Sequence, residues 1–271
     1  MRRFWLGLIS SLLCVGMIAA SSQEIISSQD LTVQLEGFRT RAQLTYPSSQ
    51  KSPFPTLLLL HAGYPSDLNA SFFENGTVIS RNFLTIAEHL SARGFAVIRY
   101  NKRFVTSATE IDQQRYDTLG INDFVADARA VLKVMGSHPL VDAKRIFVLG
   151  WSEGALVGVK LALEKPDLRG LVLIGPPVKI EGKDTALLEQ ARQLRLPVLV
   201  MQGASDSITP PEQTQRLETA LEVGNSTRLT YAMLGHGLGL VGPQGAQFTA
   251  VALEPLEDLT AWLKRTSGKV P

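Results

Sequence analysis

A serine stands between two glycines near the middle of the 271-residue sequence, in the pentapeptide Gly150-Trp151-Ser152-Glu153-Gly154. The apolar run 145–150 before it predicts a buried strand, and the amphipathic stretch 153–164 after it predicts a helix. A tight turn between a strand and a helix lifts a serine hydroxyl above the sheet, where it can act as a nucleophile. We expect glycine at 150 and 154 because a side chain there would collide with neighbouring backbone. The alternative is a glycine-rich turn without a chemical role, which the flanking strand and helix disfavour.

A serine nucleophile needs a base to remove its proton and a carboxylate to hold that base in the right tautomer. Of the four histidines, His89 lies in a helical stretch, and His138 lies at the opposite end of the nucleophile strand from the serine. His61 ends the apolar run 56–60. By elimination, the expected base is His236, which lies in a glycine-flanked loop behind a predicted strand.

The carboxylate should follow another strand between the serine and the base. Asp206 does so, in the loop directly behind the apolar run 197–202. The chain order Ser152, Asp206, His236 is the order of a triad whose serine lies on such a turn. The other carboxylates of this region lie in polar or helical segments and are weaker candidates: Asp184, Glu189, Glu212, Glu218 and Glu222.

The oxyanion that forms during acyl transfer needs backbone N–H donors aimed at it. One donor is expected from Glu153, at the N-terminus of the helix after the serine. The second should come from the loop behind the apolar run 56–60, where Gly63 allows a ligand to approach closely. The N–H of Tyr64 is the alternate. We expect His61 to be structural, with its imidazole bonded to loop backbone.

The segments that position these residues alternate between apolar runs and amphipathic stretches. Five apolar runs predict parallel strands buried on both faces: 56–60, 95–100, 145–150, 170–175 and 197–202. The amphipathic stretches predict helices over 83–93, 121–135, 153–164, 185–195, 211–223 and 256–264. Two alternating runs around Gly37 (31–36 and 39–46) predict a hairpin at the sheet edge. The pattern predicts an α/β fold, and we expect one domain over residues 23–271 because no linker or repeat divides it.

From about Pro55 onwards the chain resembles the α/β-hydrolases, in particular exported bacterial serine esterases. The similar stretches are LLLLHAGYPSDLNASF, NFLTIAEHLSARGFAVIRYNKRF, GWSEGA and GASDSITPPEQ. The resemblance implies a mostly parallel twisted sheet with helices on both faces. The sequence departs from the family at Ala62, where glycine is usual, and at Asn101 and Phe104, where Asp and Gly usually flank Lys-Arg. Relatives often insert a helical cap where this chain has only residues 178–196, so we expect a minimal cap and an open site.

The charge balance bears on the kind of partner. Lys and Arg total 27 against 25 Asp and Glu, and removal of the first 22 residues would leave 25 against 25. Nucleic-acid binding needs clustered positive charge, so we expect no nucleic-acid partner. We also expect no cofactor and no metal, because the sequence has neither a dinucleotide fingerprint, a phosphate loop nor an H-E-x-x-H motif. No obligate protein partner is implied.

The N-terminus predicts a signal peptide over residues 1–22. Arg2 and Arg3 precede an uncharged apolar run, 4–20, and small residues follow it. A membrane anchor is the alternative, but the run is short for a span of about 20 residues. Cys14 is the only cysteine, so a processed chain would have no disulfide, and Leu13 before it disfavours lipidation. We expect export to a bacterial periplasm or beyond, rather than anchoring in the membrane.

Taken together, these residues predict a serine hydrolase that cleaves carboxylic esters with short acyl groups through an acyl-enzyme. The substrate would then be a small-molecule ester. Peptidases and acyl transferases use the same triad, and the sequence does not separate them. A non-catalytic binding protein on the same scaffold is an alternative of another class. Such a protein would normally lack a member of the triad, whereas Ser152, Asp206 and His236 are all present.

Overall fold

The computed structural model describes residues 25–221 and 225–268. The expected signal peptide, residues 1–22, lies outside this part of the chain. Within the described ranges, no helix is both long enough and apolar enough to cross a membrane.

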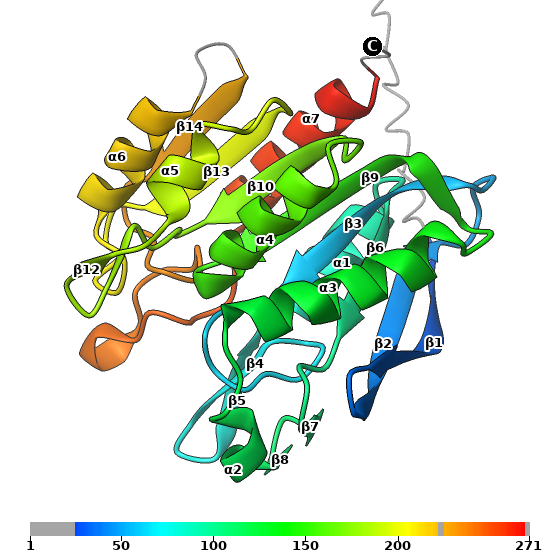
Figure 1. Cartoon of the computed structure of the whole chain (residues 1–271), viewed down its shortest axis with the longest axis horizontal. Coiled ribbons are helices and arrows are strands. Elements are labelled where there is room, and N and C mark those ends of the chain that lie inside the picture. Colours follow the sequence, from blue (N-terminus) through cyan, green and yellow to red (C-terminus); the bar gives the residue numbers. More distant parts are fainter. Residues whose placement is uncertain (1–24, 222–224, 269–271) are drawn as a thin grey trace, which may run out of the picture.

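An eight-stranded sheet forms the centre of the described chain, and six of its strands are parallel (Figure 1). In three of these strands, β6, β10 and β13, every residue is buried. This confirms the prediction from their apolar runs that these strands are covered on both faces. In spatial order the sheet consists of β1 (Ile26–Leu35), β2 (Phe38–Pro47), β6 (Ala96–Tyr100), β3 (Phe54–Leu60), β9 (Val141–Trp151), β10 (Gly170–Ile174), β13 (Val198–Gly203) and β14 (Ser226–Tyr231).

The predicted hairpin at the sheet edge consists of β1 and β2. The two strands pair antiparallel, with Leu35 opposite Phe38 next to the turn. Gly37 in that turn has φ +63°, a conformation that glycine adopts without steric cost. β2 also pairs antiparallel with β6, so the hairpin extends the parallel sheet at one edge.

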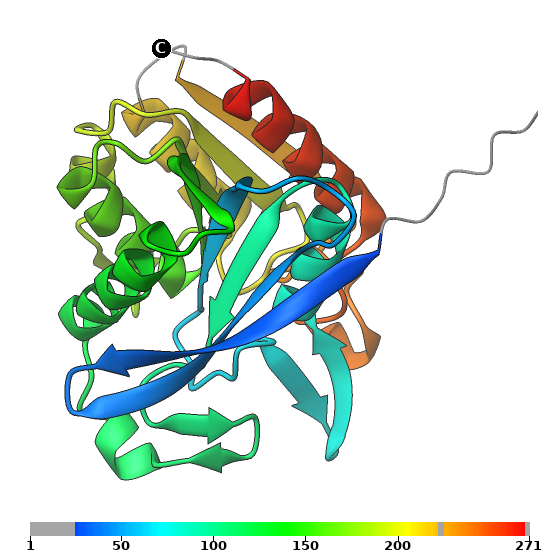
Figure 2. The same cartoon turned by 90° about the vertical axis from the view of Figure 1, so that its right-hand side faces the viewer.

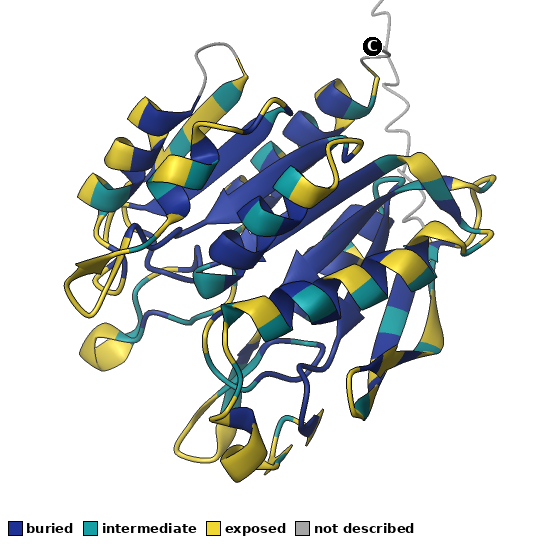
Figure 3. Cartoon of the chain, in the orientation of Figure 1, coloured by how far each residue is buried: buried dark blue, intermediate teal, exposed yellow. Residues whose placement is uncertain are grey.

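Helices cover both faces of the sheet (Figures 1 and 2). α1 (Asn82–Ser91) and α7 (Leu253–Ser267) close an apolar core on one face. On the other face a second core lies under α3 (Ile121–Gly136), α4 (Glu153–Glu164), α5 (Leu187–Ala191) and α6 (Pro211–Ala220). The burial pattern in Figure 3 shows that the sides of these helices that face the sheet are buried. This is the doubly covered α/β architecture that the sequence predicted.

Small elements form the connections that follow the parallel strands in the chain, and together they surround the carboxyl end of the sheet (Figure 1). After β3 the chain forms a hairpin of β4 (Ser71–Glu74) and β5 (Thr77–Arg81). After β6 it forms β7 (Val105–Ser107), β8 (Glu110–Ile111) and α2 (Gln113–Tyr116). After β10 it forms β11 (Lys179–Ile180) and β12 (Lys183–Asp184), and a 3-10 turn, η1 (Pro243–Gly245), lies behind β14.

The segment 178–196 contains only the β11–β12 hairpin and α5, so the cap is minimal, as expected. The helix predicted over 185–195 is wrong in length, because α5 ends at Ala191. The Thr185 hydroxyl accepts a hydrogen bond from the Leu187 N–H and so marks the start of the helix. After Ala191 the chain turns, with the Leu194 N–H donating to the Ala191 carbonyl, and enters β13.

Candidate active site

Ser152 lies at the turn between β9 and α4 in a conformation that a non-glycine residue rarely adopts, with φ +54° and ψ −121°. Its N–H donates to the carbonyl of Ile174 at the end of β10, at 2.8 Å, and this bond holds the turn against the sheet. A Cβ atom built on Gly150 or Gly154 would come within 3 Å of backbone carbonyl oxygens. The predicted steric requirement for glycine at both positions is thereby confirmed.

The imidazole of His236 and the carboxylate of Asp206 form a buried pair. The Nδ1 of His236 lies 2.8 Å from Oδ2 of Asp206, and their side chains are 1% and 0% exposed. The N–H groups of Ile208 and Thr209 donate to the other carboxylate oxygen, at 2.9 and 2.8 Å. With a carboxylate as its partner, Nδ1 bears the proton and Nε2 is left as an acceptor.

Three further side chains, two glutamines and one tryptophan, hold this pair in place. The sequence did not single out any of them for this purpose. The Gln202 amide donates to Asp206 Oδ2 at 3.0 Å. Oε1 of Gln247 accepts from the backbone N–H of His236 at 3.1 Å. The indole N–H of Trp151 donates to the His236 carbonyl at 3.0 Å. Trp151 directly precedes Ser152, so this bond links the serine turn to the loop of His236.

Gly175 lies between the serine turn and the His–Asp pair. It follows Ile174, whose carbonyl accepts the hydrogen bond from Ser152, and it has φ +50°. A Cβ atom at this position would lie 2.9 Å from Cε1 of His236 and 3.2 Å from Oδ2 of Asp206. The three predicted triad residues are therefore grouped at the carboxyl ends of neighbouring strands, around a glycine that leaves room for the imidazole.

The two segments whose backbone amides are predicted to bind an oxyanion lie next to each other. A Cβ atom on Gly63 would lie 3.2 Å from the Glu153 carboxylate, which places the loop behind β3 against the start of α4. In the described part of the chain, the N–H groups of Gly63, Tyr64 and Glu153 have no hydrogen-bond acceptor. These are the free donors that an oxyanion site requires, and both Gly63 and its alternate Tyr64 are among them.

The three other histidines make contacts away from the proposed triad. His61 is buried, and its Nε2–H donates to the carbonyl of Tyr100 at the end of β6, at 2.7 Å, rather than to its own loop. Burial, together with the nearby ammonium of Lys102, lowers the pKa of His61 to about 3, so the ring is neutral. His89 lies on α1, 3.8 Å from Glu257 of α7, and His138 accepts from the Leu140 N–H in the turn before β9.

Two of the rival carboxylates lie next to basic side chains away from this site. Asp184 lies near Lys179 and Arg216, and Glu218 pairs with Arg228. Glu222 lies outside the described residues. Among the described residues, no group of three or more histidine, cysteine, aspartate or glutamate side chains could hold a metal ion.

An aromatic cluster lies beside His236 and was not foreseen from the sequence. Phe72 and Phe248 stack at 4.3 Å between ring centroids, and Phe248 lies 5.5 Å from the His236 ring. Tyr64 contacts Phe72 at 4.8 Å, and Trp151 lies 5.7 Å from Phe248. Phe72 comes from β4 of the β4–β5 hairpin. We therefore infer that this hairpin forms part of the wall of the site.

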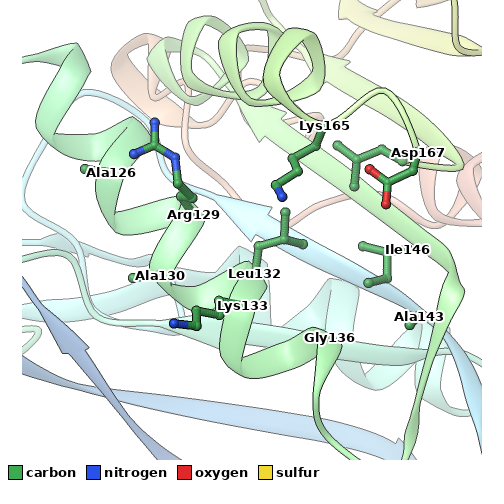
Figure 4. Close-up of a pocket in the computed structure, with 11 residues that line it drawn as sticks. Ala126, Arg129, Ala130, Leu132, Lys133, Gly136, Ala143, Ile146, Lys165 and Asp167 are labelled. Atoms are coloured by element: carbon green, nitrogen blue, oxygen red, sulfur yellow. The ribbon is translucent and has the colours of Figure 1, made fainter.

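A pocket of about 500 Å³ lies elsewhere, between α3, the C-terminal end of α4 and the first half of β9 (Figure 4). Arg129, Lys133 and Lys165 lie around an apolar floor that includes Leu132 and Ile146. None of its lining residues belongs to the candidate active site, which lies at the other end of β9.

Residues 77–189 match the family model described as serine aminopeptidase, S33. This part of the chain contains Ser152 and its flanking glycines but ends before Asp206 and His236. Esterase EstD of Thermotoga maritima is 30% identical over 158 residues, which make up 58% of this chain and 34% of that protein. The chain thus spans about a third of the length of this curated relative.

Two solved structures show the same fold at low sequence identity. A putative dienelactone hydrolase from Klebsiella pneumoniae has a TM-score of 0.66 at 16% identity, over 89% of this chain and 99% of that one. A cold-adapted esterase from an Arctic intertidal metagenomic library has a TM-score of 0.62 at 16% identity, over 87% and 94%. Together with the order of the strands, these likenesses show that the chain has the α/β-hydrolase fold, as the resemblance of its sequence implied.

Proposed function

We propose that this α/β-hydrolase is a serine hydrolase that cleaves carboxylic esters, with Ser152 as nucleophile, His236 as base and Asp206 as the orienting acid. The observation that most supports the proposal is the buried Asp206–His236 pair, packed against Gly175 at the strand end next to the strained serine turn. Burial of a carboxylate costs folding free energy, and a catalytic use of the pair gives a reason for this cost.

In the proposed mechanism, the Ser152 hydroxyl oxygen attacks the acyl carbon of the ester while Nε2 of His236 takes its proton. The carboxylate of Asp206 accepts a hydrogen bond from Nδ1–H, keeps the ring in this tautomer and stabilises the imidazolium that forms. His236 then donates the proton to the leaving alcohol. Water attacks the resulting acyl-enzyme with His236 again as base, which releases the acid and restores the serine.

Negative charge develops on the former carbonyl oxygen in both steps. The free N–H groups of Glu153 and Gly63 are the donors that we assign to it, with Tyr64 as the alternate to Gly63. Such donors are effective because they are already oriented before the reaction begins.

The choice of ester over amide rests on comparison. The relative with 30% identity is named an esterase, whereas the family model that matches residues 77–189 is named for a serine aminopeptidase. A peptidase is therefore the second candidate. Within the ester class we propose short acyl groups, because the segment 178–196 supplies only a two-stranded hairpin and a short helix near the site.

Substitution of the nucleophile tests the proposal. Ser152→Ala should fold like the parent, lose labelling by a fluorophosphonate and lose esterase activity by several orders of magnitude. Ser205→Ala, in the loop of Asp206, is the control and should still be labelled, since Ser205 is exposed and bonds only to loop backbone. Labelling of the Ser152→Ala protein at the parental rate would mean that another serine is the nucleophile. Assays of p-nitrophenyl esters and aminoacyl amides on the parent would then decide between esterase and peptidase.

Export is a further part of the proposal. We expect cleavage to leave a mature N-terminus between Ser21 and Gln23. Mass spectrometry of the protein from an expressing bacterium, fractionated into cytoplasm, membrane and periplasm or medium, tests this. Recovery of Met1 on membrane-bound protein would favour an anchor instead.

A further inference from the structure

Lys102 is a buried cation whose polar contacts are two carbonyl groups of the loop behind β3. Lys102 follows the end of β6 in the chain, and the residue is only 3% exposed. The ammonium donates to the carbonyl of Ala62 at 2.9 Å and to that of Tyr64 at 3.3 Å. These two carbonyls lie on either side of Gly63, the residue whose N–H we assign to the oxyanion.

The first of these bonds acts on the peptide unit that contains the Gly63 N–H. The carbonyl of Ala62 and the N–H of Gly63 belong to one planar trans peptide, in which the C=O and N–H groups point in opposite directions. An ammonium that holds the carbonyl on one side therefore directs the N–H to the other side. Its positive charge also polarises this peptide and makes the N–H a stronger donor.

The other neighbours of the ammonium leave the two loop carbonyls as its polar partners. Its remaining side faces the ring of Phe124, whose centroid is 4.0 Å from Nζ, and Tyr116 lies at 5.1 Å. Asp127, the buried carboxylate nearby, is bonded to the guanidinium of Arg103. Burial lowers the pKa of Lys102 to about 8, while Glu153 and Asp127 favour its charged form, so at neutral pH it is an ammonium.

Lys102 is also well placed to hold the loop because its own backbone is attached to it. The Lys102 N–H donates to the carbonyl of Ser66 at 3.0 Å. The side chain of Asn101 accepts from the Leu68 N–H at 2.7 Å and donates to the Thr106 carbonyl at 2.8 Å. The segment that follows β6 thus supports the loop that follows β3 at several points. Of these contacts, those of Lys102 lie nearest to Gly63.

We propose that Lys102 is a positioning residue for the oxyanion site, whose buried ammonium holds the Ala62–Gly63 peptide so that the Gly63 N–H faces the reacting oxygen. The proposal rests on the serine-hydrolase function proposed above. It gives Ala62, where the family usually has glycine, a defined place, because only the backbone carbonyl of this residue is used.

Lys102→Met tests the proposal, because it keeps the apolar stem and removes the donors and the charge. Loss of one oxyanion donor reduces turnover about 100-fold or more, so we expect kcat to fall by about that factor. We expect KM to stay within about threefold, because the donor acts mainly on the transition state. Fluorophosphonate titration counts the competent sites, so that partial misfolding is not read as lost turnover. Lys133→Met, an exposed lysine on α3, is the matched control and should leave both constants unchanged.

A second readout separates positioning from a merely structural role. An alkylboronic acid forms a tetrahedral adduct with the serine and places an oxygen in the oxyanion site, whereas the product carboxylate reports on ground-state binding. The affinity of Lys102→Met for the boronic acid should fall in step with kcat, and its affinity for the product should change by less than about threefold. Lys102→Arg keeps donors and charge, so its kcat should be at least about tenfold higher than that of Lys102→Met.

Two results would overturn the assignment of Lys102. One is a kcat within about threefold of the parent after active-site titration, and the other is a rise in KM without a fall in kcat. Should Lys102→Met not fold, Lys102→Gln replaces it: a kcat at least about tenfold lower at unchanged KM supports the role, and an unchanged kcat refutes it. Ser152→Ala distinguishes the two levels, since only its retained activity would count against the serine-hydrolase function itself.

Discussion

The imidazole of His236 lies against the backbone of Gly175 so closely that a Cβ atom on Gly175 would come within 2.9 Å of Cε1 of the ring. Gly175 directly follows β10, the strand next to the serine turn, and its φ of +50° turns the chain away from the sheet at this point. The absence of a side chain at this position is thus what lets the His–Asp pair approach the strand ends.

Gly175→Ala should therefore impair catalysis more than stability. The methyl group must displace the imidazole or the Asp206 carboxylate, and small displacements of catalytic groups are costly to turnover, so we expect kcat to fall at least about tenfold. The positive φ should cost roughly 1 kcal/mol of folding free energy. Gly37→Ala is the matched control, because Gly37 also has a positive φ but a Cβ there meets nothing within 4 Å. Equal effects of the two substitutions on kcat would contradict the prediction.

Gln247→Met should loosen the loop that holds His236, the proposed base. Oε1 of Gln247 accepts from the N–H groups of both His236 and Ser207, and methionine would leave the buried His236 N–H without an acceptor. We expect a loss of about 1–3 kcal/mol in the free energy of unfolding, measured by urea denaturation. We also expect kcat to fall by about tenfold, since the ring is less well held. Gln215→Met, exposed on α6, should change neither quantity, and a Gln247→Met enzyme with parental kcat would show that Asp206 alone orients the base.

Protonation of His61 should make the fold sensitive to acid. Burial lowers the pKa of His61 to about 3 in the fold, whereas the unfolded chain takes up this proton near pH 6.5. Between these values the unfolded state binds more protons, so stability is lost as the pH falls from 6.5 towards 3. His61→Asn can still donate to the Tyr100 carbonyl without titrating. Its Tm should therefore depend less steeply on pH between 4 and 6.5 than the parental Tm, and parallel curves would refute the assignment.

The acyl-chain preference should reflect the minimal cap. Each methylene adds about 0.8 kcal/mol only where the protein removes it from water, and the segment 178–196 offers little apolar surface for this. We expect kcat/KM for p-nitrophenyl esters to be highest between acetyl and hexanoyl and to decline for longer chains. A profile that still rises at decanoyl would mean that the β4–β5 hairpin or the connection over β7, β8 and α2 encloses a longer tunnel.

The sequence alone determined the elements of the sheet and the identity of the three expected triad residues. The nucleophile turn could be recognised because a strand, a tight turn and a helix are successive in the chain, so their periodicities and glycines are local signals. Asp206 and His236 could be selected because only a few polar residues follow predicted strands. The helix over 185–195 was placed too long, because amphipathic spacing does not show where a chain must turn to enter its next strand.

Only the tertiary structure decided what surrounds and supports these residues. Gln247 bonds to the loops of His236 and Asp206, Phe72 and Phe248 stack across 176 residues of chain, and Lys102 reaches back to Ala62. Contacts of this kind leave no periodic trace in a sequence, because they depend on which strand ends become neighbours in the sheet. The order β6-β3-β9-β10-β13-β14 brings those ends together, and it arises from pairing between segments far apart in the chain. The residues expected to do the chemistry could thus be named from local pattern, whereas the residues that orient them depend on long-range packing.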